Sequence, residues 1–431
     1  AVSAANGSSS EPGESLLSAL GHRAELLAPE MSAHNVATMF DAYALLGRRP
    51  RQSLLVALGQ RAEKVTPDMA AADVASTFNA YQELREQPSE LLLEVLGKRA
   101  QEVAPRMAAH DVASVLNTYA RLVKQPGEQL LAVLGERAQA VVPDMGARDV
   151  ANVLNAYAEF RRRPREPLQA ALRQRAEAVA HEMGPQAVAE ALHGYGRLDI
   201  QPGDPLLEAL GQRAEVVAAA MRARDVANTL SAYAMLHRQP SRVLLSSLEH
   251  RLESVAPDMG AHDAASSFHA FAELDRQPGG AAQAALSSAS VRTAPRMNAQ
   301  GVAQVLTAHV RLGLRPRAPL LDALGRRART VAADMTAHEV AGVLDAYRVL
   351  GKPPRKPVLA ALEQRAEHVT PAMSAQDVAK TLGAYAKLHI HPDRLEAAID
   401  DTSEDAEKSE KKQEDSDTGD GGEPLRAMEQ A

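Results

Sequence analysis

Short polar side chains recur at a fixed interval in this chain, and hydrogen bonding to a ligand is the chemistry that they could perform. The stretch "DVASVLNTYARL" (111–122) returns thirty-eight residues later as "DVANVLNAYAEF" (149–160), and both copies keep an Asn, Asn117 and Asn155. Asn, Ser, Thr, Asp, His, Gln and Arg are the residue types that read nucleobase edges. The repetition therefore predicts a modular binding surface.

The same interval runs through the chain and predicts its architecture. Met recurs every 38 residues from Met31 to Met373, and Pro does so from Pro50 to Pro392, which defines ten tandem copies without insertion or deletion. In the first copy, helical spacing of apolar residues predicts helix A over 14–27, ended by Pro29, and helix B over 32–46. One such hairpin cannot bury its own apolar faces. We therefore expect an all-α fold, a right-handed α-solenoid of about ten 38-residue helical hairpins.

The domain organisation follows from the limits of this period. We expect a disordered N-terminal segment over 1–13, the solenoid over 14–395, and a disordered acidic tail over 396–431. Residues 400–431 contain 12 acidic and 4 basic residues, so the remaining chain carries a net charge of +1. Deleting 400–431 is expected to tighten RNA binding at low salt, because the tail competes with phosphate for basic residues.

A helical wheel of helix B separates an apolar side from a polar stripe. In the first copy the stripe consists of positions 34, 38, 41 and 45, and the equivalent positions of all copies form four columns, which we name the helix B stripe. The second and third columns favour short residues, whereas a free helix surface would carry more Glu, Lys and Gln. This preference favours base reading over a merely solvated surface, the alternative that the sequence leaves open. The residues predicted to bind RNA, and to be exposed, are Ser76, Asn79, Ser114, Asn117, Asn152, Asn155, His193, Asn228, Ser231, His269, Thr307 and Asp345.

Three further columns have structural interpretations. The Arg column that begins at Arg23 recurs with an acidic column that includes Asp73, and we expect an ion-pair ladder between helices, with phosphate binding as the alternative. The Met column is expected to fill the core at the turn between helices A and B. Copy eight, with Gly279 and Gly280 at its start and several Ser in helix A, is the expected place for bending or fraying.

Composition limits the classes of function. The absence of Cys excludes disulfides and thiolate chemistry, and no stretch approaches the roughly 20 apolar residues of a membrane span. His389 and His391 are too few for a predicted metal site, and no residue set stands apart from the repeats as a catalytic centre would. We therefore expect no enzyme activity, no metal and no cofactor. Basic patches at 161–165 and 311–329 could hold phosphates, but a net charge of +1 over the body is a poor match for nucleic acid.

The segments "RAQEVAPRMAAHDVASVLNTYARL" (99–122) and "RARTVAADMTAHEVAGVLDAYRVLGKPP" (327–354) resemble the octotricopeptide repeat family, which has 38-residue helical-hairpin repeats. The resemblance covers 14 to about 395. It implies binding of single-stranded RNA, about one base per copy, in organellar RNA processing, stability or translation, in a chloroplast or mitochondrion. The chain departs from the family in having Asp41, Asn79 and Asn117 where Trp is frequent.

A second class of function stays open, a monomeric protein-binding or peptide-binding α-solenoid scaffold of the HEAT or armadillo type. A continuous positive groove along the helix B stripe would favour RNA, and a mixed or negative surface would favour a protein.

Overall fold

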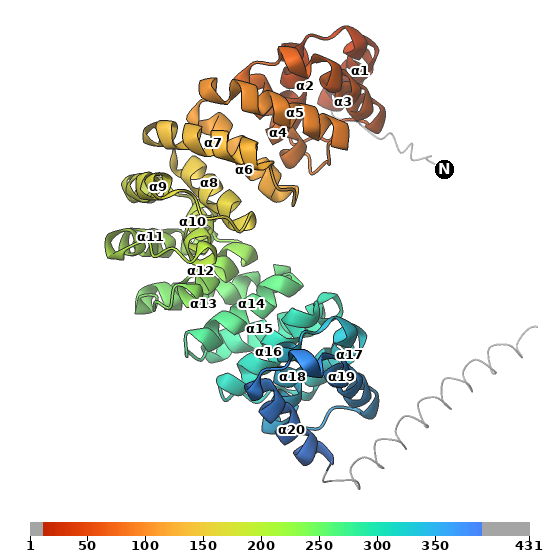
Figure 1. Ribbon diagram of the computed structural model, residues 1–431, viewed down its shortest axis with the longest axis vertical. Coiled ribbons are helices and arrows are strands. Elements are labelled where there is room, and N and C mark those ends of the chain that lie inside the picture. The colour runs from red at the N-terminus through yellow and green to blue at the C-terminus, as the bar shows by residue number, and fades with distance from the viewer. Residues whose placement is uncertain (1–11, 390–431) are drawn as a thin grey trace, which may run out of the picture. The chain divides into compact units, whose positions relative to one another are not determined.

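The computed structural model describes residues 12–389, so most of the predicted N-terminal segment and the whole predicted tail lie outside the described residues. The described part of the chain is all-helical and contains no strand. It divides into two compact units, the first ending at Val255 and the second beginning at Ala256 (Figure 1). None of the described helices is long and apolar enough to cross a membrane.

Each copy consists of helix A, a single 3-10 turn and helix B, so the predicted solenoid of 38-residue hairpins is confirmed. The first unit contains α1 Pro12–Leu27, α2 Ala33–Leu45, α3 Gln52–Val65, α4 Ala71–Glu83, α5 Glu90–Val103, α6 Ala109–Arg121, α7 Glu128–Val141, α8 Ala147–Glu159, α9 Glu166–Val179, α10 Pro185–Leu198, α11 Asp204–Val217, α12 Ala223–Met235 and α13 Arg242–Val255. The second contains α14 Ala261–Glu273, α15 Gly280–Thr293, α16 Ala299–Arg311, α17 Ala318–Val331, α18 Ala337–Leu350, α19 Lys356–Val369 and α20 Ala375–His389. The 3-10 turns are η1 Ala28–Glu30, η2 Thr66–Asp68, η3 Ala104–Arg106, η4 Val142–Asp144, η5 Ala180–Glu182, η6 Ala218–Ala220, η7 Ala256–Asp258, η8 Ala294–Arg296, η9 Ala332–Asp334 and η10 Thr370–Ala372.

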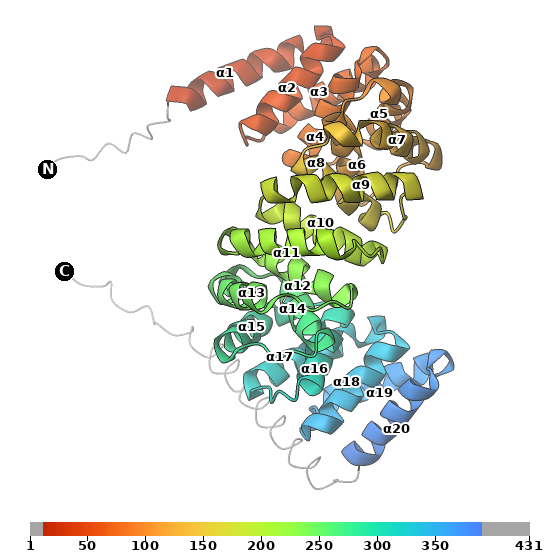
Figure 2. The same cartoon turned by 90° about the vertical axis from the view of Figure 1, so that its left-hand side faces the viewer.

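Within each unit, helix A packs on helix A of the next copy and helix B packs on helix B (Figure 2). Copy three shows how the sequence produces this arrangement. Leu92, Leu96 and Ala100 of α5 are fully buried, and Met107 at the turn is fully buried as predicted. The Asp111 carboxylate caps the start of α6. It accepts a hydrogen bond from the Ala108 backbone N–H at 2.9 Å, which satisfies a free donor at the helix end.

A glycine in helix A admits an aromatic side chain of helix B. The Tyr119 hydroxyl lies against Gly97, where a Cβ would come within 2.7 Å of it. The Tyr157 and Tyr233 hydroxyls lie equally close to Gly135 and Gly211 in copies four and six. In these copies the glycine therefore makes room for the tyrosine hydroxyl.

The predicted ion-pair ladder is wrong. Arg137 of α7 donates from Nε to the Met107 carbonyl at 2.7 Å, and Arg61, Arg99, Arg175, Arg213, Arg251, Arg327 and Arg365 make the same bond to the Met carbonyl of the preceding copy. The acidic column instead caps helix B, as Asp111 does. The Arg column therefore joins successive copies through backbone carbonyls.

Copy eight lacks this Arg and replaces it from another position. Ala289 stands in the Arg column, and Arg292, one turn further along α15, donates to the Met259 carbonyl at 2.9 Å. Both helices of the copy are regular over their full length. The copy does bury two polar atoms without a hydrogen-bond partner in the described structure, Ser290 Oγ and His309 Nε2, which is consistent with its reduced expected stability.

Candidate nucleic-acid interface

The second and third columns of the helix B stripe lie at the contact between neighbouring B helices. Ser114, Asn117 and Asn152 are buried. The other nine residues predicted to bind RNA are half-buried, namely Ser76, Asn79, Asn155, His193, Asn228, Ser231, His269, Thr307 and Asp345. The expectation that these positions are exposed is therefore wrong, although base reading by the half-buried residues stays a prediction.

Asn117 shows why short residues are preferred here. It is 2% exposed, and its Nδ2 donates to Gln82 Oε1 of the preceding copy at 3.0 Å. The Thr118 hydroxyl donates to the same oxygen at 3.4 Å. A long side chain at 117 would have no room between the two B helices. The bias toward Asn, Ser and Thr thus has a packing cause that is sufficient without a ligand.

The first column is mostly exposed, and three of its histidines contact the capping acid of the next copy. His110 Nδ1 lies 3.1 Å from Asp149 Oδ1, and His34 and His338 contact Asp73 and Asp377 in the same way, each at 3.0 Å. The hydrogen bond to Asp149 raises the pKa of His110 against the opposing effect of burial. Burial alone would raise the pKa of Asp149. The hydrogen bonds from His110 and from the Gly146 N–H outweigh burial, so the pKa of Asp149 is lowered. His262 has no such partner, because Gly301 replaces the Asp.

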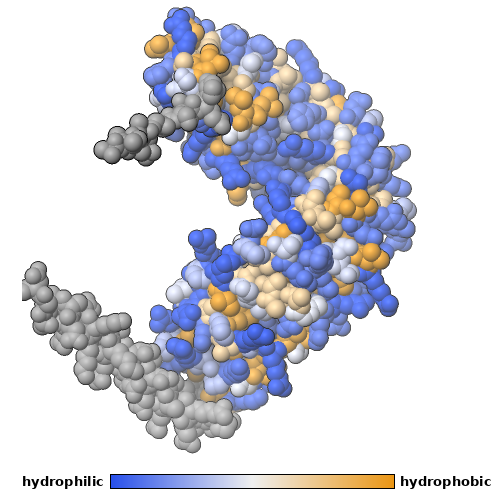
Figure 3. Space-filling model, turned by 180° about the vertical axis from the view of Figure 1, so that it is seen from behind, coloured by the Kyte–Doolittle hydropathy of each residue, from blue (hydrophilic) through white to orange (hydrophobic). Residues whose placement is uncertain are grey.

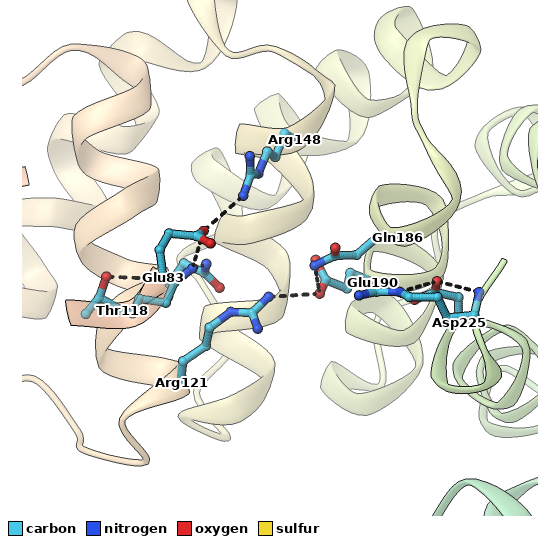
Figure 4. A network of polar contacts seen from close by, with 10 residues as sticks. Glu83, Thr118, Arg121, Arg148, Gln186, Glu190 and Asp225 are labelled. Atoms are coloured by element: carbon cyan, nitrogen blue, oxygen red, sulfur yellow. Dashed lines mark hydrogen bonds and ion pairs between the residues drawn. The ribbon is translucent and has the colours of Figure 1, made fainter. Parts of the chain in front are cut away.

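Fourth-column residues form ion pairs with first-column or second-column residues two copies away. In the first unit, Arg148 of copy four reaches Glu83 of copy two at 3.4 Å, and Arg121 of copy three reaches Glu190 of copy five at 3.4 Å (Figure 4). Each pair passes over a copy whose middle columns carry short residues. Sequence spacing could not reveal these contacts, since the partners are 65 and 69 residues apart.

The helix B stripe is therefore a surface of mixed charge whose cations are largely neutralised by acids of the same surface. Arg197 pairs with Glu159, and Arg311 of the second unit pairs with Glu273. Over the residues that the structure describes, this surface offers many donors and acceptors and carries charges of both signs. Figure 3 shows mostly hydrophilic residues on the face in view, with apolar ones in small groups.

The structure also contains grooves that were not predicted from the sequence. They lie between neighbouring A helices, above the contact between the glycine and the tyrosine. The copy-four groove, of about 500 Å³, has Gly135 and Tyr157 at its floor, and the copy-six groove, of about 410 Å³, has Gly211 and Tyr233. The copy-nine groove, of about 160 Å³, lies in the second unit over Gly325 and Tyr347. The glycine and tyrosine columns, taken together, carried a signal for these grooves.

The rims of the three grooves differ in charge. The copy-four groove includes the patch at 161–165, where Arg162, Arg163 and Arg165 pair with Glu128, Asp199 and Glu136 at 3.1, 2.6 and 3.3 Å. The copy-six rim consists of Asp204, Glu208, Glu215 and Arg238. The copy-nine rim consists of Asp322, Arg326, Lys352 and Arg355. Over the residues that the structure describes, no group of three His, Asp or Glu side chains could hold a metal ion.

The comparison with solved structures gives only low similarity scores. A homology model of the full-length AP-3 complex in an intermediate open conformation matches at 9% identity and a TM-score of 0.28, covering 88% of this chain and 76% of that one. A circular tandem repeat protein with novel repeat topology matches at 14% identity and a TM-score of 0.22, covering 91% and 99%. At these scores neither likeness informs function. No curated protein matches the sequence.

The family comparison is more specific. The sequence matches the family described as RNA-editing substrate-binding complex 6 protein over residues 12–92, 52–241 and 171–317, which overlap and together span more than half of the chain. The octotricopeptide repeat resemblance is not confirmed by this match. With its repeated helical hairpins and this match from α1 to the turn after α16, the chain belongs to the RNA-editing substrate-binding complex 6 protein family.

Proposed function

We propose that this chain acts in an organellar RNA-editing or RNA-processing complex as a non-catalytic module that binds single-stranded RNA. The observation that carries the proposal is the family match over residues 12–317, because the family is described by a complex that binds RNA-editing substrates. Of the two organelles predicted from the sequence, the family match is consistent with the mitochondrion and gives no support to the chloroplast.

The helix B stripe supports binding by hydrogen bonds more than by net charge. Its exposed first column offers Arg224, which forms no ion pair with the described residues, beside half-buried Asn155 and Asn228. His110 and Arg148 of the same column already contact Asp149 and Glu83. Because acids neutralise most cations of this surface, we expect contacts there to add specificity with little salt dependence. Phosphates then have to be held by cations elsewhere on the chain.

A protein-binding scaffold is the second candidate. It is favoured by the mixed charge of the helix B stripe, where Arg121 and Arg148 are already paired with acids. A protein surface with both signs of charge would match such a surface better than a polyanion would.

One experiment separates the two functions. The full chain is incubated with a random pool of single-stranded RNA at low salt, and retained RNA is sequenced over successive rounds, with a duplex pool as the control. We expect retention of single-stranded RNA and enrichment of short sequences. If the chain retains no RNA and instead associates with proteins of an editing complex, the scaffold function replaces the RNA-binding one.

A further inference from the structure

The copy-nine groove combines unneutralised cations with an orphaned hydroxyl group. It lies between α17 and α19, with Gly325 and Tyr347 at its floor. Its volume of about 160 Å³ corresponds to several water molecules at about 30 Å³ each, which is room for a small oxyanion.

The rim has an excess of two positive charges. It carries three cations, Arg326, Lys352 and Arg355, and one acid, Asp322. Arg326 and Lys352 are exposed and form no ion pair with any residue that the structure describes, and Arg355 reaches Asp322 only at 3.7 Å. The rim of the copy-six groove instead has three acids and one cation. That cation, Arg238, forms an ion pair with Asp204 at 2.6 Å.

The floor offers a hydrogen-bond donor that nothing uses. Tyr347 is 3% exposed, and its hydroxyl has no hydrogen-bond partner in the described structure. Burial, and secondarily Asp322, raise the pKa of Tyr347, so the hydroxyl keeps its proton at neutral pH.

The start of α19 adds to the positive electrostatic potential at the rim of the groove. Arg355 is its N-cap residue, and no side chain caps the helix. The positive end of a 14-residue helix dipole therefore lies at the rim, beside Pro353 and Pro354 of the segment that precedes the helix.

We propose that the copy-nine groove binds a phosphate group of single-stranded RNA, held by Arg326, Lys352 and Arg355 with the Tyr347 hydroxyl as a further donor. The claim that the phosphate belongs to RNA rests on the proposed function. The claim that the groove binds a phosphate group rests only on the charges and the hydroxyl group of the groove. The groove lies beyond residue 317, where the family match ends.

The test measures RNA affinity of the full chain by fluorescence anisotropy as a function of salt. Arg326→Gln/Lys352→Gln is compared with wild type and with Arg238→Gln/Arg242→Gln, which removes the same charge near the copy-six groove. We expect the copy-nine variant to bind about 10-fold more weakly at low salt, with a salt slope smaller by about one phosphate contact. The control variant should stay within about 2-fold of wild type. Equal weakening of both variants would overturn the proposal, because it would indicate only net charge.

A second readout does not depend on RNA. The thermal midpoint is measured in inorganic phosphate and in chloride at equal ionic strength. Phosphate should protect wild type and the copy-six control by a larger shift than it protects the copy-nine variant, and Tyr347→Phe should lose part of that shift while keeping its midpoint in chloride. If phosphate protects all four proteins equally, the groove is not a phosphate site. If protection is specific but no RNA binds, the groove binds phosphate and the proposed RNA function fails.

Discussion

The helix B stripe of the first unit and the copy-nine groove of the second unit use arginine in opposite ways. Arg121 and Arg148 of the stripe are held by Glu190 and Glu83 of copies two away. Arg326 of the groove has no acidic partner among the described residues, and its neighbour Lys352 has none either. A cation already paired gains less from a phosphate, because its own acid must be displaced. The comparison teaches that free charge, and not the number of Arg residues, marks a surface suited to a polyanion.

The largest expected effect concerns the packing of Tyr119, which lies on the buried side of helix B. Tyr119→Ala removes a side chain that is 5% exposed and contacts Phe78 at a ring distance of 5.3 Å. We expect it to destabilise the first unit by about 3–5 kcal/mol through the cavity that it leaves. Chemical denaturation measures the change, and Tyr119→Phe is the control that keeps the ring. A loss below 1 kcal/mol for the Ala variant would mean that the ring does not hold the copies together.

A smaller effect tests whether the middle columns are structural. Asn117→Ala loses the bond to Gln82, so we expect a cost of about 0.5–1.5 kcal/mol. Asn155→Ala is the matched control, because Asn155 makes no side-chain hydrogen bond within the described residues and should change stability very little. Selection of RNA by both variants tests base reading at the same time. A relaxed preference at a single RNA position with unchanged stability would restore the direct-reading role predicted for Asn117.

The pairs that join copies two apart should couple weakly. A double-mutant cycle on Arg121→Gln and Glu190→Gln should give about 0.2–1 kcal/mol, decreasing with added salt, because Arg121 is 38% exposed. The same substitution of Arg121 should leave the salt slope of RNA binding nearly unchanged. A slope that falls as much as in the copy-nine variant would remove the distinction between the two regions.

The smallest effect depends on pH. The pKa of His110 is raised in the folded chain, so its stabilising contribution is complete below the ordinary His pKa and is lost as pH rises through the folded value. The pKa of Asp149 is lowered, so its contribution is present above the ordinary Asp pKa and is lost as pH falls. His110→Gln should therefore cost a few tenths of a kcal/mol between about pH 4 and 6.5 and less at pH 8. His262→Gln, at the equivalent position where Gly301 replaces the acid, is the control in the same thermal melts.

The period and the hairpins could be predicted from the sequence, because both depend on residues close together in the chain. The helix caps are equally local, since Ser374 with Asp377 and Thr336 with Glu339 form them within four consecutive residues. The exposure of Asn117 was mispredicted, because a helical wheel identifies a side of one helix but not what covers it. The Arg column was assigned the wrong partner, since an acidic column and a backbone carbonyl are equally compatible with a 38-residue period. Unpaired charge at Arg326 could be recognised only once the ion pairs of the other cations were known.

Crosslinking of bound RNA tests the central claim most directly. The full chain is irradiated with a photoreactive single-stranded RNA, and the crosslinked peptides are identified by mass spectrometry. The account predicts crosslinks within 318–329 and 352–358 around the copy-nine groove, and their loss in Arg326→Gln/Lys352→Gln. Crosslinks confined to 111–122 and 149–160, and unchanged in that variant, would contradict it.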